Sequence, residues 1–547
     1  MMRAFGIVVK TALVLILMFA SNHGLLERFG YFITARRYAL GSAYGTIWLC
    51  ALMAVLYSAL TPRLLCRMFW GVLIVLAGFL ADAYFSIMKL HYNIDSAEAL
   101  WNMRFWAGDV ITSFRDLMLW PTIRALALLG LCVTPPVLQQ LKARRLALAP
   151  LVPILLSTVI IFGTGGYGMA GLPSQFSTIS LAGMFALYDL GMGEREAVTI
   201  KKTSAPAIQH IVLIIDEGIR GDFVNFSDAA TATPYLKSIR EQIIDFGITS
   251  AGNNCSQASN ALLRMGANPR SLGVRGENIM KNPSIWKYAR AAGYETTFLD
   301  AQANNGILIN YMNPDEKSLI DHFIQIDMPV AYYNDREAAR IIQSRLTAKK
   351  PQFIYLNKRG VHFHYEYSYP HEFLTFYPSL AAGEVTRDRT KLINSYKNAI
   401  LWAVDGFFKT LLSNAPDLGN AVVIYTADHG QNLLEDGDPV THCREKPTQQ
   451  EAMVPLLVMT GNRPLFEKFK EAAEINKNRA NHFQIFPTIL ELFGFSPAEI
   501  KESYYVTLFD RVPERLGFTS GAVFGRFGKT PKWIPLPEDI ARCCDKQ

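Results

Sequence analysis

Three short stretches of this 547-residue sequence bring together side chains that favour divalent metal ions. The stretches "IIDEGIRGDF", "KRGVHFHYE" and "YTADHGQNLLEDG" supply Asp216 and Glu217, His362 and His364, and Asp428 and His429. Carboxylate and imidazole ligands without a cluster of thiolates suit Zn²⁺ or Mn²⁺ better than iron–sulfur or copper(I). A single Asp-His pair would be weak evidence, but three such stretches in one chain indicate a metal-dependent reaction.

A fourth stretch supplies a hydroxyl group that a metal ion could activate. In "AGNNCSQASNALLRMGAN" (Ala251–Asn268), small and hydroxyl residues open an apolar run with helical spacing. The free backbone N–H groups at a helix N-terminus suit a phosphate group, and a metal lowers the pKa of a hydroxyl so that it can attack. Ser256 and Ser259 are both candidates for this hydroxyl, and either could instead serve only as a helix N-cap.

The elements that position these residues are short apolar runs, each typical of a buried strand. They are His210–Asp216, Glu295–Asp300, Gln352–Asn357, Ala421–Thr426 and Val454–Met459. Helical stretches such as "LINSYKNAILWAVDGFFKTLLSN" lie between them. This alternation predicts an α/β domain with a mainly parallel central sheet, in which chemistry gathers at the carboxyl ends of the strands.

The N-terminal third of the chain is much more apolar than the rest and indicates a membrane domain. Apolar residues make up 50% of the sequence and charged residues 18%, and the apolar excess lies before about Gly166. Each of five stretches approaches the roughly 20 residues that cross a bilayer core. They are Ala4–Ala20, Leu40–Leu60, Cys66–Met88, Pro121–Leu138 and Leu146–Gly166. A cleaved signal peptide is the alternative for the first, but no A-x-A site follows it.

The charges of the short loops predict how these spans are oriented. Thr61–Arg67 and Leu141–Ala147 are basic and lack acidic residues, so both are expected on the cytoplasmic side. Five spans then place everything after Gly166 on the outer side. The three arginines of the first loop oppose this orientation.

Three parts are predicted along the chain. Residues 1–166 form the membrane domain, residues 167–207 a connector near the membrane surface, and residues 208–547 the exported catalytic domain. A net charge of +7 without a basic stripe argues against a nucleic-acid partner. Four cysteines, Cys255, Cys443, Cys543 and Cys544, fall in the exported part, where oxidation is permitted. A Cys255–Cys443 bridge is possible, but the spacing does not choose among the three pairings.

Five spans followed by an exported α/β domain resemble the phosphoethanolamine transferases of Gram-negative envelopes, within the alkaline phosphatase/sulfatase superfamily. The resemblance covers essentially the whole chain. "IIDEGIRGDF" is similar to the family's G-E-T-x-R-x-D, which implies that Glu217 binds a metal ion. "YTADHGQNLLEDG" is similar to D-H-G-E-S-x-x-E-x-G, which makes Asp428 and His429 the other two metal ligands.

The same resemblance assigns the nucleophile and the substrate-binding residues. "NCSQASNALL" is similar to C-G-T-x-T-A, and counting from the cysteine places the nucleophile, itself a metal ligand, on Ser259, with Ser256 as the alternative. "RGVHFHYEYSYP" is similar to G-S-H-G-P-x-Y-x-x-x-Y-P, which makes His362 a substrate-binding or second-metal histidine. His442 falls one residue from the family's next histidine and is expected to bind substrate. The chain departs from the pattern with serine for threonine, with Gln431 for the signature glutamate, and in lacking a second cysteine and a proline.

The resemblance implies a double displacement at phosphorus that depends on Zn²⁺, or alternatively Mn²⁺. The donor would be phosphatidylethanolamine, the intermediate a phospho-serine on Ser259, and the acceptor lipid A or another envelope glycan. The protein is expected to be a monomer of the bacterial inner membrane with its catalytic domain in the periplasm. Two alternatives are a phosphoglycerol transferase that uses phosphatidylglycerol and an inactive membrane-anchored scaffold. The intact Glu217, Asp428 and His429 argue against the scaffold.

Overall fold

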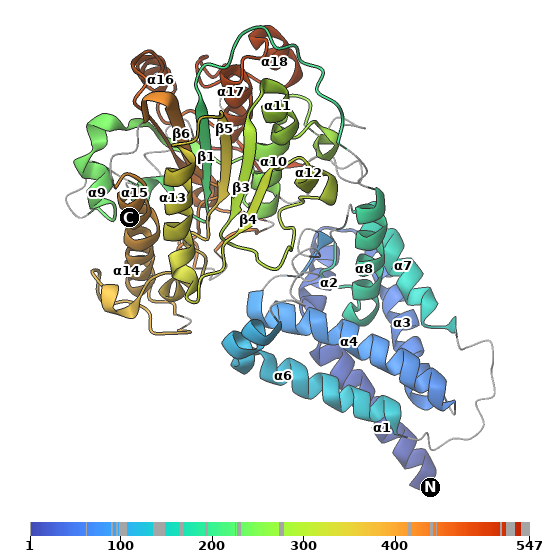
Figure 1. The fold of residues 1–547 in the computed structure, drawn as a ribbon. Coiled ribbons are helices and arrows are strands. Elements are labelled where there is room, and N and C mark those ends of the chain that lie inside the picture. Colours follow the sequence, from blue (N-terminus) through green and yellow to red (C-terminus); the bar gives the residue numbers. More distant parts are fainter. Residues whose placement is uncertain are drawn as a thin grey trace. The chain divides into compact units, whose positions relative to one another are not determined.

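The computed structural model divides the chain into two compact units, Met1–Met192 and Gly193–Gln547 (Figure 1). It describes residues 2–61, 63–88, 91–94, 97, 107–134, 148–164, 166, 168–191, 195–224, 226, 231–272, 278–384, 386–413, 418–437, 441–444, 446–514, 517–520 and 531–537. The first unit is helical and the second is a layered α/β domain. The predicted connector, residues 167–207, runs across the boundary, and helix α8 (Ser174–Gly191) within it belongs to the first unit.

The first unit consists of helices with long apolar surfaces. They are α1 (Met2–Ala20), α2 (Leu25–Thr34), α3 (Tyr38–Leu60), α4 (Leu64–Met88), α6 (Ala107–Val133), α7 (Leu151–Gly163) and α8. Among the described residues, three helices are long and apolar enough to cross a membrane, or four if the pair α1 and α2, bent by 72°, counts as one broken span. Five spans were predicted. The fifth falls on α7, whose 13 residues rise only about 20 Å. Residues 135–147, which hold the ends of the fourth and fifth predictions, lie outside the described residues.

Several charged side chains among the described residues of this apolar unit have polar partners. Asp82 on α4 accepts two hydrogen bonds from Arg124 on α6, at 2.7 and 2.8 Å, and lies 2.8 Å from His23 Nε2. Lys10 Nζ donates to the carbonyls of Ala59 and Thr134 at 2.8 and 3.1 Å. Pairing of this kind is what lets ionisable residues lie within apolar helices.

The second unit is built on a seven-stranded sheet with the strand order β2-β7-β6-β1-β5-β3-β4. The strands are β1 (His210–Asp216), β2 (Ile244–Ser250), β3 (Glu295–Asp300), β4 (His322–Gln325), β5 (Gln352–Asn357), β6 (Ala421–Ala427) and β7 (Met453–Thr460). The neighbours β6-β1-β5-β3-β4 pair in parallel, whereas β7 is antiparallel to both β6 and β2. The prediction of a mainly parallel sheet is therefore confirmed.

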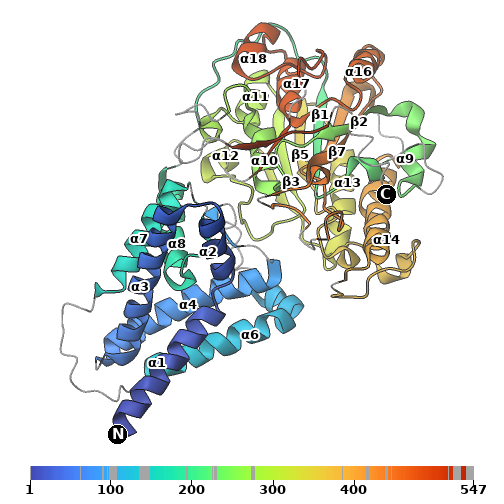
Figure 2. The same ribbon diagram turned by 180° about the vertical axis from the view of Figure 1, so that it is seen from behind.

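Helices cover both faces of this sheet (Figures 1 and 2). The main helices are α9 (Pro234–Ser238), α10 (Ser256–Met265), α11 (Ile285–Ala292), α12 (Pro314–Ser318), α13 (Asn334–Arg345), α14 (Arg389–Ile400), α15 (Gly406–Leu411), α16 (Arg463–Asn476), α17 (Ile485–Leu492) and α18 (Pro497–Ser503). Alternate residues of β1 enter two separate cores. Val212 packs with residues of α13, α14 and α15, and Leu213 packs with residues of α11, α16 and α17. Burial on both faces explains why the strand is apolar throughout, since each such side chain contributes about 1.5–3 kcal/mol.

A small two-stranded sheet, β8 (Phe518–Ser520) and β9 (Lys532–Ile534), supports the loop before α10. Thr519 donates from its backbone N–H to the carbonyl of Gly252 at 2.9 Å and accepts from Asn253 Nδ2 at 2.9 Å. The loop is thereby fixed where α10 begins. The start of α10 and the carboxyl ends of the parallel strands are the elements that form the site.

Candidate active site

Three of the predicted residues meet at the carboxyl ends of neighbouring strands. Glu217 follows β1, and Asp428 and His429 follow β6, which is the parallel neighbour of β1. His429 Nε2 lies 3.1 Å from Glu217 Oε1 and 3.7 Å from Asp428 Oδ1. All three side chains are buried. Residues more than 200 positions apart in sequence thus form one cluster, as predicted by the rule that functional residues gather at the carboxyl ends of strands (the strand-end rule).

The hydroxyl at this cluster belongs to Ser256 and not to Ser259. Ser256 is the first residue of α10, after the N-cap residue Cys255. Its Oγ lies 3.0 Å from His429 Nε2 and 3.3 and 3.2 Å from the two carboxylate oxygens of Glu217. Ser259 Oγ instead donates to the carbonyl of Asn253 at 2.9 Å and accepts from its backbone N–H at 3.2 Å. Ser259 is fully buried and fastens the loop to the helix.

The donor atoms of the cluster fit a divalent metal ion. One ligand atom each from Glu217, His429 and His442 lies within 4.8 Å of the others. His429 Nδ1 is 2.7 Å from the carbonyl of Gly430, which leaves Nε2 free to face the cluster. Asp428 Oδ1 accepts backbone N–H groups from Gly218 and His429 at 3.0 and 2.7 Å. Its other oxygen, Oδ2, is buried without a hydrogen-bond partner among the described residues, which suits an oxygen that ligates a metal ion.

The electrostatics of the cluster also favour a cation. Burial alone would raise the pKa of the Glu217 carboxyl, but the hydrogen bond and charge of His429 hold it well below its ordinary value. Burial, together with the charge of Glu217, raises the pKa of Asp428 well above its ordinary value. Burial would lower the pKa of His429, but the two carboxylates outweigh it and raise that pKa to about 9. Two carboxylates share one imidazole here, so a bound cation would relieve the excess negative charge.

Of the other predicted histidines, His442 contacts the cluster, His362 lies at its edge and His364 points away from it. The His442 ring stacks on the His429 ring with centroids 4.2 Å apart. Burial, with the charge of His429, lowers the pKa of His442 well below its ordinary value and keeps the ring neutral. His362 is exposed, and its ring centroid is 5.9 Å from that of His442. His364 points elsewhere, toward Glu366 at 3.7 Å, and burial lowers its pKa to about 4.

A disulfide joins Cys255 to Cys443. Cys255 immediately precedes Ser256, and Cys443 immediately follows His442. The backbone N–H of Cys443 also donates to the carbonyl of Asn254 at 2.9 Å. The bridge therefore ties the start of α10 to the loop that carries His442. Cys543 and Cys544 lie outside the described residues.

Sequence reasoning did not identify Gln302 or Lys358. Gln302, two residues past the end of β3, donates from Nε2 to Glu217 Oε2 at 3.1 Å and to the carbonyl of Lys358 at 2.8 Å. Lys358 follows β5 and forms a fully buried ion pair with Asp216, whose other oxygen accepts the backbone N–H of Glu217. Tyr425 also donates to Asp216, at 2.9 Å. Applying the strand-end rule to all polar residues, and not only to Asp and His, would have found both.

The Lys358→Met variant is expected to lower the free energy of unfolding by about 3–5 kcal/mol, because Asp216 would be left buried without its counter-ion. A urea titration of the purified protein would measure the change. The matched control is Lys397→Met, since Lys397 is only half-buried and its ammonium lies 5.5 Å from the ring centroid of Phe376. An equally small effect for both variants would contradict this account of the ion pair.

The pH dependence of stability is expected to report on His482, which lies behind the site with Nε2 3.2 Å from Thr426 Oγ1. Burial lowers the pKa of His482 to about 3. The unfolded chain binds a proton here below about pH 6.5, whereas the folded protein does not. The free energy of unfolding should therefore fall with decreasing pH between these values, by up to about 1.4 kcal/mol per pH unit. His482→Gln should reduce this slope in urea titrations across the window, whereas His371→Gln, at an exposed histidine, should not.

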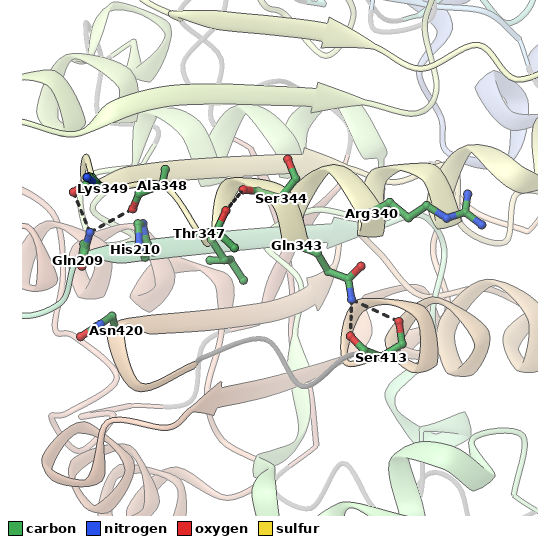
Figure 3. A pocket seen from close by; sticks show the side chains of 11 residues that line it. Gln209, His210, Arg340, Gln343, Ser344, Thr347, Ala348, Lys349, Ser413 and Asn420 are labelled. Atoms are coloured by element: carbon green, nitrogen blue, oxygen red, sulfur yellow. Dashed lines mark hydrogen bonds between the residues drawn. The ribbon is translucent and has the colours of Figure 1, made fainter.

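A hollow in the catalytic unit lies at the end of the sheet opposite the cluster (Figure 3). Its walls include Gln209 and His210 at the start of β1, and Gln343 on α13. Gln209 Nε2 donates to the carbonyls of Ala348 and Lys349 at 3.2 and 2.9 Å. Strand β1 has seven residues and spans about 20 Å, so this hollow is separate from the cluster around Glu217.

The model of the family described as Sulfatase matches residues 209–495, which is more than half of the chain. The chain belongs to the sulfatase family. The matched residues run from the start of β1 to beyond α17 and include every member of the cluster. This match, together with the observed sheet, confirms the predicted sulfatase-like α/β fold.

The relatives of this sulfatase-family protein support the likeness to phosphoethanolamine transferases. Over 151 residues it is 27% identical to the Kdo(2)-lipid A phosphoethanolamine 7''-transferase of Escherichia coli (strain K12) and 28% identical to that of Salmonella typhimurium (strain LT2). Each alignment covers 26% of this chain and 26% of the relative, so the chain matches about a quarter of the length of these curated relatives.

A solved structure shares the fold. It is the integral membrane protein lipooligosaccharide phosphoethanolamine transferase A from Neisseria meningitidis, with a TM-score of 0.62 and 14% sequence identity. The match covers 88% of this chain and 95% of that chain. The likeness therefore spans most of both chains, and the apolar helices of the first unit support a membrane-anchored protein.

Proposed function

We propose that this chain transfers phosphoethanolamine from phosphatidylethanolamine to lipid A or another envelope glycan, through a covalent intermediate on Ser256. The observation that carries the proposal is the position of Ser256 Oγ, which contacts both His429 Nε2 and the carboxylate of Glu217 at the start of a helix. A hydroxyl in this position meets the requirements of an activated nucleophile. The names of the aligned relatives point to the same reaction.

Four residues would hold a metal ion, for which we propose Zn²⁺ with Mn²⁺ as the alternative. They are Glu217, Asp428, His429 and Ser256. The mixture of carboxylate and imidazole donors and the unpartnered Asp428 Oδ2 support this assignment. When bound, the ion lowers the pKa of the serine hydroxyl and offsets charge on the transferring phosphoryl group. We assign Ser256 here in place of Ser259, because Ser259 Oγ is held by the backbone of Asn253.

The reaction is a double displacement at phosphorus. Ser256 Oγ forms a bond to phosphorus while the bond from phosphorus to the diacylglycerol oxygen breaks, and that oxygen leaves with a proton. An oxygen of the acceptor then attacks phosphorus, the bond to Oγ breaks, and the serine hydroxyl is restored with the acceptor's proton. Glu217 and His429 orient Oγ for attack, and the free N–H groups of the first turn of α10 bind a phosphoryl oxygen.

The two remaining imidazoles serve the phosphoryl group and its leaving oxygen. His442 stacks on His429 and is neutral. A neutral imidazole can donate a hydrogen bond to a phosphate oxygen or bind a second metal ion through its other nitrogen. His362 is exposed at the edge of the site, where it can exchange a proton with the leaving oxygen and the acceptor. Gln302 holds Glu217 Oε2 and so fixes the rotamer of the carboxylate.

The catalytic unit is proposed to face the periplasm, and the protein to act as a monomer in the inner membrane. The disulfide between Cys255 and Cys443 supports an oxidising compartment for this unit. The parts are residues 1–166 within the membrane, residues 167–207 as the connector, and residues 208–547 as the catalytic domain. The lipid donor then lies in the same bilayer that anchors the enzyme.

The test is the intact mass of the purified protein after incubation with phosphatidylethanolamine. We expect an adduct of phosphoethanolamine mass that disappears when lipid A is added. An adduct of phosphoglycerol mass formed from phosphatidylglycerol instead would favour the phosphoglycerol transferase. No adduct and no turnover with either lipid would favour the inactive scaffold.

A further inference from the structure

Exposed apolar side chains of the catalytic unit gather beside the site. Among the described residues of this unit, the exposed large apolar side chains are Val330 (42%), Tyr333 (38%), Tyr367 (45%), Tyr377 (65%) and Ile475 (48%). Only Ile475 lies on a distant helix, α16. The other four, here called the tyrosine rim, follow strands β4 and β5. Scattered apolar residues on a surface are ordinary, but a concentration at one edge indicates an interaction surface.

The two loops that carry the tyrosine rim are joined through one buried tryptophan, Trp402. Trp402 lies between them, with its ring centroid 5.7 Å from those of Tyr332 and Tyr333 and 4.8 Å from that of Phe373. Tyr332 and Tyr333 follow β4, and Phe373 follows β5. Figures 1 and 2 show these segments at the end of the sheet where β3, β4 and β5 finish.

This surface borders the site directly. Asp335, two residues after Tyr333, accepts the backbone N–H groups of Arg359 and Gly360 at 2.8 and 3.0 Å. These two residues lead from β5 to His362. The loop with Tyr333 is therefore fastened to the same turn that delivers His362. A surface that seats on the tyrosine rim would lie next to the opening of the site.

The chemistry of the rim fits the headgroup layer of a bilayer. Tyrosine is enriched at this level because its ring is apolar and its hydroxyl is polar, and basic residues accompany it there. Here the Arg336 guanidinium lies 3.4 Å from the ring centroid of Trp402, and the Lys397 ammonium lies 5.5 Å from that of Phe376. The same chain carries helices long and apolar enough to cross a bilayer.

We propose that the tyrosine rim seats on the headgroup layer of the bilayer that holds the chain, so that a lipid phosphodiester reaches Ser256 without leaving the membrane. The contact with lipid stands on the exposure and composition of the rim. Only the identity of the lipid that enters there rests on the proposed function. The alternatives, which the quenching test below distinguishes, are that the rim contacts the helical unit of the same chain or faces solvent.

Quenching by brominated lipids tests the contact itself. The full chain carrying Tyr367→Trp would be placed in nanodiscs with lipids brominated near the headgroup end of the chains, and compared with nanodiscs of unbrominated lipid. The emission added by this tryptophan should be lost in brominated lipid, whereas the emission added by Ile475→Trp should not. Equal quenching of both variants, or of neither, would overturn the proposal.

A second measurement separates seating from catalysis. The variant with serine at all four rim positions should raise the KM for phosphatidylethanolamine in bilayers by about tenfold or more. Its turnover of glycerophosphoethanolamine, a soluble donor, should not change, and Ile475→Ser should leave both values unchanged. Loss of turnover with both donors would overturn the seating role. If the wild-type protein turned over neither donor, the proposed function would fail, and the quenching result would still decide the rim.

Discussion

The Ser256→Ala variant is expected to form no phosphoethanolamine adduct and to lose transfer activity by about four orders of magnitude or more. The reason is that Ser256 Oγ is the hydroxyl that the structure brings to His429 Nε2 and Glu217, at 3.0 and 3.2 Å. Without it, no oxygen at the cluster can form the first bond to phosphorus. Intact mass and the initial rate of transfer from phosphatidylethanolamine would both be measured.

Ser259→Ala is the matched control, because it removes the same group three residues further along the same helix. Ser259 Oγ bonds only to the backbone of Asn253, and the residue is fully buried. This variant is expected to keep the adduct, while its free energy of unfolding falls by about 1–3 kcal/mol because buried backbone groups lose their partner. An adduct that persists in Ser256→Ala and disappears in Ser259→Ala would reverse the assignment.

The choice between the two serines illustrates what sequence alone could not decide. Counting from Cys255 along the family pattern selects Ser259, whereas the structure begins α10 at Ser256. Three residues of helix rise about 4.5 Å, which is enough to carry a hydroxyl from the open end of the helix into the interior. A shift of this size depends on where the helix starts, and helix ends are the least certain part of a prediction.

The central strands and the residues of the cluster could be predicted from the sequence, because the strands are buried on both faces and their ends bring the cluster together. Strands β1, β3 and β5 begin and end at the predicted residues, since strands buried on both faces give unbroken apolar runs. Parallel pairing then carries Glu217 and Asp428 to one edge. Strand β2 was missed because Gly247 and an irregular register interrupt its pattern, and β4 because its four residues are only half-buried.

The ion-pair partners of the buried charged residues could not be predicted from the sequence in the same way. Arg220, which follows β1, is one example. In the structure it is fully buried and bonds to Asp222 and to Glu435, which is more than two hundred residues away in sequence. Lys358 likewise meets Asp216 only through the pairing of β5 with β1. Such contacts depend on the complete fold and leave no local pattern.

The Glu217→Gln variant is expected to bind Zn²⁺ more weakly by more than about 100-fold, beyond the loss typical of a residue that only orients a ligand. Glutamine keeps the shape of the side chain and its distance to Gln302 but removes one of the two carboxylates of the cluster. The metal content of the purified protein would be measured after treatment with a chelator and reloading with Zn²⁺. Glu366→Gln is the control, because Glu366 is a buried carboxyl group that is not part of the metal cluster.

Stability measurements distinguish the loss of a ligand from general damage to the fold. Zn²⁺ at about a thousand times its dissociation constant should raise the free energy of unfolding of the wild-type protein by about 4 kcal/mol, and a chelator should remove this gain together with activity. The Glu217→Gln variant should show neither effect. Without metal it should be less stable than the metal-free wild-type protein, because it loses the contact with His429 that holds the Glu217 pKa well below its ordinary value. A variant that lost this stability but bound Zn²⁺ as tightly as the wild-type protein would instead give Glu217 a purely structural role.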